Sequence, residues 1–119
     1  MIVGLGVDLV EIDRIRRAME NPRFAQRILT PLELEFATTP SRVAGRWAAK
    51  EAIYKAVGLP MTWQDIEILP DETGKPKATI DPRFFDPGRL RLHLTITHEK
   101  SNAIALAILE RLVFQAVRA

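Results

Sequence analysis

The hydrophobic period of the sequence changes near Gly58, and this change limits the available folds more than any other feature. Between a first apolar strand and Gly58, apolar residues recur at the spacing of amphipathic helices. After Gly58, apolar and polar residues alternate, as in strands with one buried face. Because strands follow helices here rather than alternating with them, we expect an α+β domain with antiparallel pairing.

Two short helices are predicted before residue 40. The first is rich in arginine and covers Asp13 to Glu20, where Asn21-Pro22 breaks it. Thr30-Pro31-Leu32-Glu33 has the form of a capping box with proline at the first helical position, so a second helix is expected from there to about Ala37.

The longest predicted helix covers Arg42 to Val57. Ser41 is available as its N-cap, and Gly58 is a natural C-terminal stop. Three alanines recur every four residues along it: Ala44, Ala48 and Ala52. Since small side chains permit close packing, we expect this helix to lie across the sheet.

Strands are predicted at both ends of the chain. They cover residues 2–12, 65–68, 76–80, 89–98 and 103–109. Residues 103–109 are apolar on both faces, which is typical of a central strand. In the first strand, Gly4 and Gly6 share a face with Asp8. The bare surface beside Asp8 suits either an approaching ligand or a closely packed neighbouring backbone.

The composition narrows the chemistry that the chain can perform. Its 119 residues fit a single domain, residues 1–119, and they include no cysteine. A disulfide framework and a thiolate zinc site are therefore excluded, and any metal must have oxygen or histidine ligands. The first residues lack a basic signal-peptide region and no apolar run has membrane-spanning length, so we expect a cytoplasmic protein without membrane contact.

Positive charge is concentrated in one stretch of the sequence. Five arginines and a single acid, Glu20, lie between residues 14 and 27: Arg14, Arg16, Arg17, Arg23 and Arg27. Such a patch suits an acidic or phosphate-bearing partner, and it equally suits a solvated helix face.

Four side chains are candidates for chemistry, although each also has a structural explanation. Asp8 lies in an apolar strand, where a carboxylate is costly unless paired or coordinated, but it also fits a strand-end turn cap. Glu51 and Lys55, one helical turn apart, fit a surface ion pair. His98 ends an alternating strand and fits a hydrogen-bonded structural histidine.

Taken together, these residues favour chemistry on phosphates. Asp8 and Glu51 are hard oxygen donors that suit Mg²⁺, with water and phosphate oxygens completing its octahedron. Lys55 lies one turn beyond Glu51 and would reach the same phosphates. A metal and a lysine on one pyrophosphate is the usual arrangement where charge builds on a leaving phosphate.

The chain resembles the holo-[acyl-carrier-protein] synthases, the small single-domain type of the 4'-phosphopantetheinyl transferase family. Four segments carry the resemblance, in the family's order: Gly4-Leu5-Gly6-Val7-Asp8 with Arg14, Gly45 to Gly58 with its Lys50-Glu51-Ala52 and Lys55 core, Trp63 to Ile68 with the turn Gly74-Lys75-Pro76, and Thr95-Ile96-Thr97-His98-Glu99. They span nearly the whole chain.

The resemblance implies a fold and a set of site residues. The fold is a small α+β domain with a long helix packed on an antiparallel sheet, assembled as a homotrimer with active sites at subunit boundaries. Asp8 and Glu51 would bind Mg²⁺, and Lys55 would contact the pyrophosphate of coenzyme A. Three further residues would lie near the phosphates of its nucleotide half, the first and last from across the interface: Arg46, Lys50 and His98.

The implied reaction moves the 4'-phosphopantetheine group of coenzyme A to a serine of apo acyl carrier protein and releases 3',5'-ADP, in support of fatty acid biosynthesis. Arg14 and its neighbours would face the acidic recognition helix of the carrier protein. The general base stays open between Glu51, a metal-bound water, Glu33 and Glu35. The segment after Gly58 is shorter than the glycine-rich loop of many relatives, so contacts from that loop to the cofactor are left open.

Two other function classes fit parts of the sequence. A non-catalytic coenzyme A- or nucleotide-binding module would leave Asp8 and Glu51 structural. An RNA-binding protein would fit a sequence pI of about 9.3, but only 7% of the residues are aromatic and they form no stacking platform. We therefore expect no nucleic-acid partner.

Overall fold

The computed structural model describes residues 1–113, so the last six residues of the predicted 1–119 domain lie outside the described part. The elements, in chain order, are β1 (Ile2–Glu11), α1 (Ile12–Ala18), α2 (Pro22–Ile28), α3 (Pro31–Phe36), α4 (Pro40–Val57), the 3-10 turn η1 (Trp63–Asp65), β2 (Ile66–Pro70), β3 (Pro76–Ile80), β4 (Leu90–His98) and β5 (Asn102–Arg111). Within these residues, none of the helices has the length and apolarity needed to cross a membrane.

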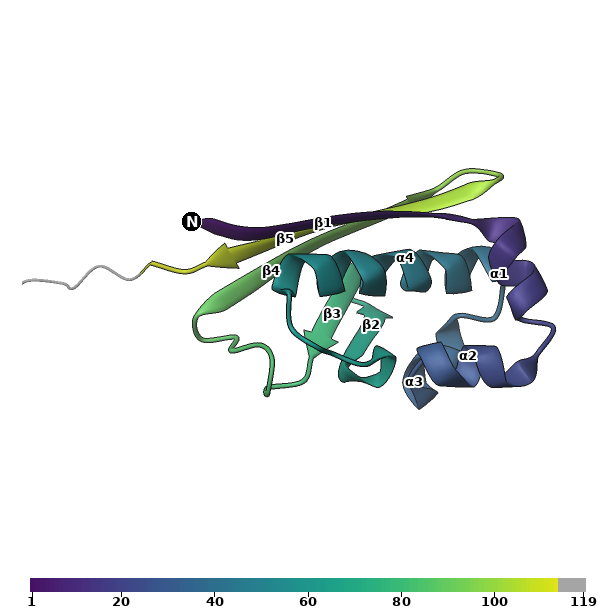
Figure 1. Ribbon diagram of the computed structural model, residues 1–119, viewed down its shortest axis with the longest axis horizontal. Helices are drawn as coiled ribbons and strands as arrows, with labels where there is room; N and C mark the ends of the chain where they lie inside the picture. Colours follow the sequence, from purple (N-terminus) through teal and green to yellow (C-terminus); the bar gives the residue numbers. More distant parts are fainter. Residues whose placement is uncertain (114–119) are drawn as a thin grey trace, which may run out of the picture.

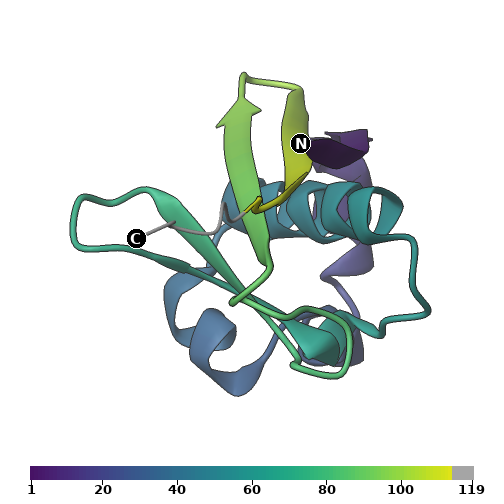
Figure 2. The ribbon, with the colours of Figure 1, turned by 90° about the vertical axis from the view of Figure 1, so that its left-hand side faces the viewer.

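The strands form two antiparallel groups rather than one sheet. A three-stranded sheet has the order β1-β5-β4, and a separate two-stranded sheet pairs β2 with β3 (Figure 2). The central position predicted for the strand at residues 103–109 is confirmed, because β5 pairs on both edges. Helix α4 runs along the three-stranded sheet, with β2 and β3 on its other side and the short helices near its N-terminal end (Figure 1).

Helix α4 approaches the sheet closely because both surfaces carry small residues. Ala44, Ala48 and Ala52 are fully buried, as the predicted ridge requires. A Cβ added at Gly4 would overlap the carbonyl of Ala56, and one at Gly6 would overlap the carbonyl of Ala52. Of the two explanations for these glycines, close backbone packing is therefore the one that the structure shows, and room for a ligand is not.

The helix boundaries differ from the predictions at two prolines. Thr39, not Ser41, caps α4, and its Oγ1 accepts from the backbone N–H of Arg42. Pro40 occupies the first helical position, where its missing N–H costs nothing. For the same reason Pro22 begins α2 instead of only ending α1, and the Asn21 side chain caps this unpredicted helix. The capping box at Thr30 and the left-handed Gly58 stop are both confirmed.

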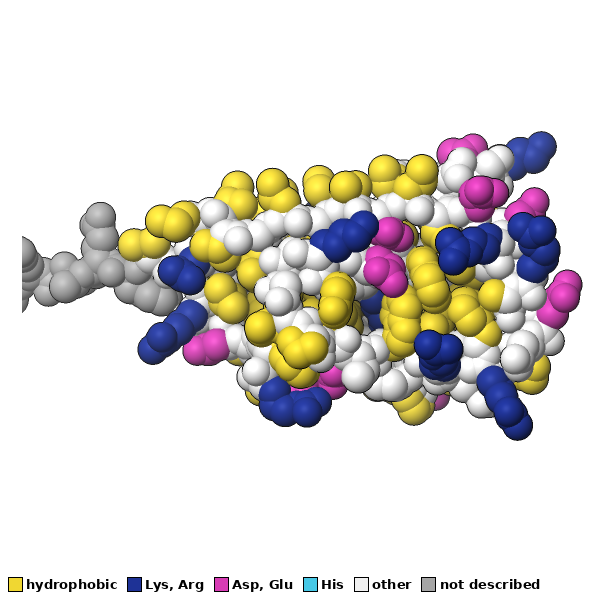
Figure 3. Space-filling model, viewed as in Figure 1, with side chains coloured by type: hydrophobic (Ala, Val, Ile, Leu, Met, Phe, Trp, Pro, Cys, Tyr) yellow, Lys and Arg dark blue, Asp and Glu magenta, His cyan; other side chains and the backbone are white. Residues whose placement is uncertain are grey.

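The outer face of the three-stranded sheet, away from α4, is apolar and exposed. On β1, Leu5, Val7 and Leu9 are 63%, 52% and 63% exposed. They pair in register with apolar residues of β5: Ile108, Leu106 and Ile104. Figure 3 shows hydrophobic side chains standing along the upper edge of the molecule, over β1. A contiguous patch of this kind is typical of a surface that another protein covers.

Candidate active site

Three of the predicted site residues meet between β1 and α4. Asp8 lies on the α4-facing side of β1, opposite the small residue Ala105 of β5. Glu51 and Lys55 lie one turn apart on α4. The Lys55 ammonium donates to the Val7 carbonyl at 3.0 Å and to Asp8 Oδ1 at 3.3 Å. Asp8 thus forms one charged cluster with two residues that follow it by 43 and 47 positions in the sequence, Glu51 and Lys55.

The cluster holds two carboxylates that oppose each other electrostatically. Partial burial raises the pKa of Glu51, the negative charge of Asp8 raises it further, and Lys55 offsets part of the rise. The side chain of Asp8 is 18% exposed and that of Lys55 is 51% exposed. Solvent and solutes therefore reach the site, and an added cation would relieve the repulsion.

The donor set fits a magnesium ion with few protein ligands. Among residues 1–113, no three or more side chains of His, Cys, Asp or Glu gather to hold a metal. Asp8 and Glu51 supply hard carboxylate oxygens. Mg²⁺ commonly binds through one or two carboxylates and keeps the remaining positions for water and substrate phosphate, so these two residues are sufficient for that type of site.

An open cavity of about 530 Å³ adjoins Glu51. Glu51 and Tyr54 of α4 contribute to one side of it. The segment around η1 provides further lining residues, largely apolar: Met61, Trp63 and Ile66. Arg27 of α2 also lines it. A long, flexible group of mixed polarity would fit beside the carboxylate cluster.

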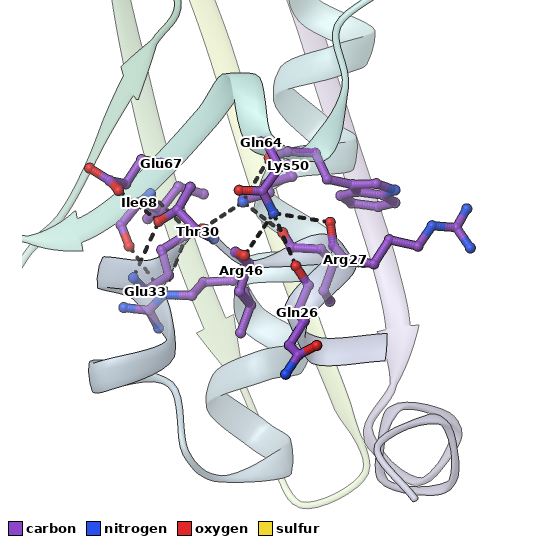
Figure 4. A network of polar contacts seen from close by, with 12 residues as sticks. Gln26, Arg27, Thr30, Glu33, Arg46, Lys50, Gln64, Glu67 and Ile68 are labelled. Atoms are coloured by element: carbon purple, nitrogen blue, oxygen red, sulfur yellow. Dashed lines mark hydrogen bonds and ion pairs between the residues drawn. The ribbon is translucent and has the colours of Figure 1, made fainter. Parts of the chain in front are cut away.

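Lys50 and Arg46 lie away from this cluster, in a buried polar network (Figure 4). Lys50 is 2% exposed, and its ammonium donates to Glu33 Oε1, to the Ile28 carbonyl and to the Trp63 carbonyl. Arg46 Nε donates to the Ile68 carbonyl at 3.1 Å, and burial lowers the pKa of its guanidinium. Neither side chain projects freely into solvent within the single chain.

His98 lies at the far end of β4, next to the turn that joins β4 to β5. It borders a shallow depression whose other polar lining residues are Arg16, Ser41, Glu99 and Lys100. The single chain therefore unites Asp8, Glu51 and Lys55, and it leaves His98 separate from them.

The arginines between residues 14 and 27 are all exposed, and they lie on α1 and α2. Arg16 pairs with Asp13. Arg27 also lines the cavity beside Glu51, a position that the sequence did not predict.

The sequence singled out the segment from Trp63 to Ile68, but it did not predict how this segment contacts α2 and α4. Gln64 Nε2 donates to the carbonyls of Gln26, Arg27 and Leu29, at the end of α2. Trp47 of α4 packs against Trp63 with ring centroids 4.6 Å apart. The pairing of a helix end with a glutamine 35 or more residues away leaves no periodic signal in the sequence. The capping box at Thr30 was the one local clue to this network.

Comparison with known proteins identifies a family and its fold. The sequence model of the 4'-phosphopantetheinyl transferase superfamily matches residues 4–109. A holo-[acyl-carrier-protein] synthase of Exiguobacterium sp. is 46% identical over 92% of this chain and 93% of its own length. One of Halalkalibacterium halodurans is 44% identical over 94% and 98%, respectively.

Solved structures with the same architecture include two further holo-synthases. One, from Bacillus anthracis str. Ames in complex with CoA (3',5'-ADP), is 36% identical with a TM-score of 0.80, and covers 92% of this chain and 96% of that one. Another, from Neisseria meningitidis, is 35% identical with a TM-score of 0.82, and covers 92% and 99%.

Proposed function

The chain belongs to the 4'-phosphopantetheinyl transferase superfamily, and from this we propose that it transfers the 4'-phosphopantetheine group of coenzyme A to a serine of apo acyl carrier protein. The products are holo acyl carrier protein and 3',5'-ADP, and the reaction serves fatty acid biosynthesis in the cytoplasm. The observation that carries the proposal is the cluster of Asp8, Glu51 and Lys55 beside an open cavity, in a chain 46% identical to a holo-synthase. Residues 1–119 act as one domain.

Asp8 and Glu51 bind Mg²⁺ in this proposal, and Lys55 contacts the pyrophosphate of coenzyme A. Bound there, the ion supplies charge stabilisation for the pyrophosphate oxygens. Lys55 is half exposed and anchored at its tip by Val7 and Asp8, so its ammonium faces the same region as both carboxylates. The cavity beside Glu51 orients the substrate and excludes part of the solvent.

The transfer requires a serine hydroxyl to lose its proton as its oxygen attacks the β-phosphorus, while the bond to the leaving 3',5'-ADP breaks. Glu51 is the first candidate for the base, directly or through a metal-bound water, because it lines the cavity beside Asp8 and Lys55. Glu33 is fully buried and accepts hydrogen bonds at both oxygens, so it is removed from the candidates. Glu35 is exposed on α3 and stays a weaker one.

Arg46 and His98 bind the nucleotide phosphates of coenzyme A from a neighbouring subunit. Their separation from Asp8 within one chain supports a site shared between subunits. Lys50 was expected to join them, but its three hydrogen bonds within the chain would first have to break.

The apolar outer face of the three-stranded sheet is the surface through which three copies associate. Leu5 and Leu106 lie on adjacent strands of this face. Sedimentation of the purified chain is expected to give the mass of a trimer, and Leu5→Asp together with Leu106→Asp is expected to give monomers. A monomeric wild-type chain at micromolar concentration would contradict this arrangement.

The carrier protein docks against the arginines of α1 and α2. Arg14→Glu is expected to raise KM for apo acyl carrier protein about tenfold, while KM for coenzyme A stays near the wild-type value. Added salt should reproduce the effect in the wild type, because exposed charges are screened. Loss of affinity for coenzyme A alone would show that the patch serves the nucleotide instead.

The direct test of the function is intact-protein mass spectrometry. Apo acyl carrier protein is incubated with the chain, coenzyme A and Mg²⁺, beside a reaction that contains a chelator. A gain of one phosphopantetheine mass that disappears with chelator supports both the transfer and the metal. Coenzyme A binding by the folded chain, without a mass gain on any of several carrier proteins, would support the alternative of a non-catalytic binding module.

A further inference from the structure

The buried network around Lys50 has no part in the reaction described so far. The Lys50 ammonium donates to oxygens from three different elements: Ile28 at the end of α2 at 2.7 Å, Glu33 of α3 at 2.6 Å and Trp63 of η1 at 2.9 Å. An ammonium has three protons, so all of its donors are used. This saturation is why a lysine can be buried here at all.

The partner carboxylate of Glu33 is equally saturated. Its Oε1 also accepts from the Thr30 N–H at 2.8 Å, and its Oε2 accepts from the Ile68 N–H at 2.9 Å. Burial lowers the pKa of Lys50, whereas the hydrogen bond and charge of Glu33 act in the opposite direction. Within residues 1–113, no buried side-chain nitrogen or oxygen lacks a hydrogen-bond partner. The pair thus joins α2, α3, α4, η1 and β2 in one network (Figure 4).

The position of Lys50 connects this network to the proposed active site. Lys50 directly precedes Glu51 on α4, and both residues line the same cavity. Trp63 lines it as well, from η1. The bond from Lys50 to the Trp63 carbonyl therefore links α4, which carries the carboxylate, to a second element of the cavity lining.

The other face of α4 packs against β1. There, Ala52 and Ala56 lie against Gly4 and Gly6 of β1. These small residues set how closely the helix approaches the sheet, and Lys55 also ties this side of α4 to Val7 and Asp8 of β1. The hydrogen bonds of Lys50 act on the opposite side of the helix, where they tie α4 to α3 and η1, which the contacts with β1 do not reach.

We propose that Lys50 is a positioning residue, whose ammonium ties α4 to Trp63 and Glu33 so that Glu51 is held at the edge of the cavity. This inference rests on the proposed transferase function, and it replaces the direct phosphate contact expected for Lys50. Lys50 acts through Glu51, because protein oxygens take all three of its ammonium protons and leave none for a phosphate.

The test compares Lys50→Met with Thr30→Val in the complete chain. Lys50→Met removes the ammonium with little change in volume. Thr30→Val cuts the same network away from the cavity, where the Thr30 hydroxyl donates to Glu67 and accepts from the Glu33 N–H that it caps. Turnover is measured at a temperature where both variants are folded. We expect kcat to fall about tenfold or more in Lys50→Met, since a misplacement of about 1 Å can cost about 100-fold, and to stay within about twofold in Thr30→Val.

A second variant guards against loss of folding in Lys50→Met, which takes the hydrogen-bonded cation from buried Glu33 and leaves it only Arg46, whose Nε lies 4.0 Å from Glu33 Oε2. In Glu33→Gln/Lys50→Met both charges of the pair are absent, so the unfolding midpoint should recover in part while kcat stays low, and Arg46 then lacks its carboxylate neighbour. Near-ultraviolet circular dichroism of the Trp47–Trp63 pair gives a readout without substrate. We expect it to change in both Lys50 variants and to remain as in the wild type in Thr30→Val.

Two results would overturn the proposal. A kcat within about twofold of wild type in the folded Lys50 variants would leave Lys50 a purely stabilising residue. A rise in KM for coenzyme A with unchanged kcat in the Lys50 variants would support the original expectation that Lys50 contacts a phosphate of coenzyme A. Absence of transfer by the wild type is a different outcome: it removes the proposed function, and the circular dichroism then still decides whether Lys50 fixes the position of Trp63.

Discussion

Two lysines of helix α4, only five residues apart, each pair with a carboxylate from another element. One pair is buried, and the other is partly exposed to solvent. Lys50 and Glu33 meet at 2.6 Å with side chains 1% and 0% exposed. Lys55 and Asp8 meet at 3.3 Å with side chains 51% and 18% exposed. The first pair has every polar atom in use. The second leaves carboxylate oxygens, including those of Glu51, available to a ligand.

The contrast shows that residue type alone does not separate structural from functional charges. Burying an ion pair has a desolvation penalty that is offset only when all of its polar atoms are hydrogen-bonded. The elements that supply those hydrogen bonds must therefore keep a fixed geometry. An exposed pair is worth about 0–1 kcal/mol, so it can be rearranged by a substrate at little cost. The half of α4 near Lys55 is suited to exchange of ligands, and Lys50 is suited to fixing α4 relative to α2, α3 and η1.

The largest expected effect is the loss of stability in Glu33→Gln. The buried Lys50 ammonium would lose its hydrogen-bonded counter-charge and keep only the electrostatic attraction of Glu67, and breaking such a pair costs about 3–5 kcal/mol. Urea denaturation monitored by tryptophan fluorescence measures the change. The matched variant Asp8→Asn breaks the exposed pair and should change the free energy of unfolding by less than about 1 kcal/mol. Equal losses of unfolding free energy in Glu33→Gln and Asp8→Asn would show that the buried and the partly exposed pair stabilise the fold alike.

Glu51→Gln tests whether the cluster near Lys55 serves activity rather than stability. Turnover should fall about 100-fold or more, the usual cost of removing one group that stabilises developing charge. The unfolding midpoint should not fall, because the substitution removes a carboxylate that repels Asp8. Mass spectrometry of the carrier protein follows the rate, and Glu35→Gln under the same conditions tests the weaker candidate base. Near-normal turnover with Mg²⁺ would exclude Glu51 as ligand and as base.

The smallest expected effect is on how stability depends on pH. The pKa of Glu51 is raised in the folded chain, so its ionisation opposes folding at neutral pH. As pH falls through this raised pKa, protonation removes the penalty, and the effect is complete below the ordinary glutamate pKa. Glu51→Gln should therefore be slightly more stable than wild type at pH 7, with the difference vanishing toward pH 4. A difference that grows on acidification would contradict the raised pKa.

Much of the fold could be predicted because its determinants are local. The capping box at Thr30 and the Gly58 stop depend on neighbours three or four residues away. The alternation in β4 and the double-sided apolar pattern of β5 depend on neighbours two residues away. Pro22 and Pro40 were harder, since proline both ends one helix and begins another, and only the following structure decides between these roles.

The candidate site was predicted in part. Asp8, Glu51 and Lys55 do come together, and their metal and phosphate roles stay proposals. The expected place of Lys50 among the phosphates did not anticipate its burial, because α2, α3 and η1 must first assemble before the ammonium meets Ile28, Glu33 and Trp63. The exposure of Leu5 and its neighbours was likewise unforeseen, since alternation does not say which face meets the helix.

The sequence by itself determined the order and type of most elements, the small residues that bring α4 against β1, and the family to which the chain belongs. Only the tertiary structure decided which charges are buried. The reason is physical: helix and strand periods are set by nearby residues, whereas the environment of a side chain depends on elements distant in the sequence. Lys50 and Lys55 are the same residue type on one helix. Only Lys50 is covered by α2, α3 and η1, and this packing makes Lys50 a buried structural residue while Lys55 stays half exposed.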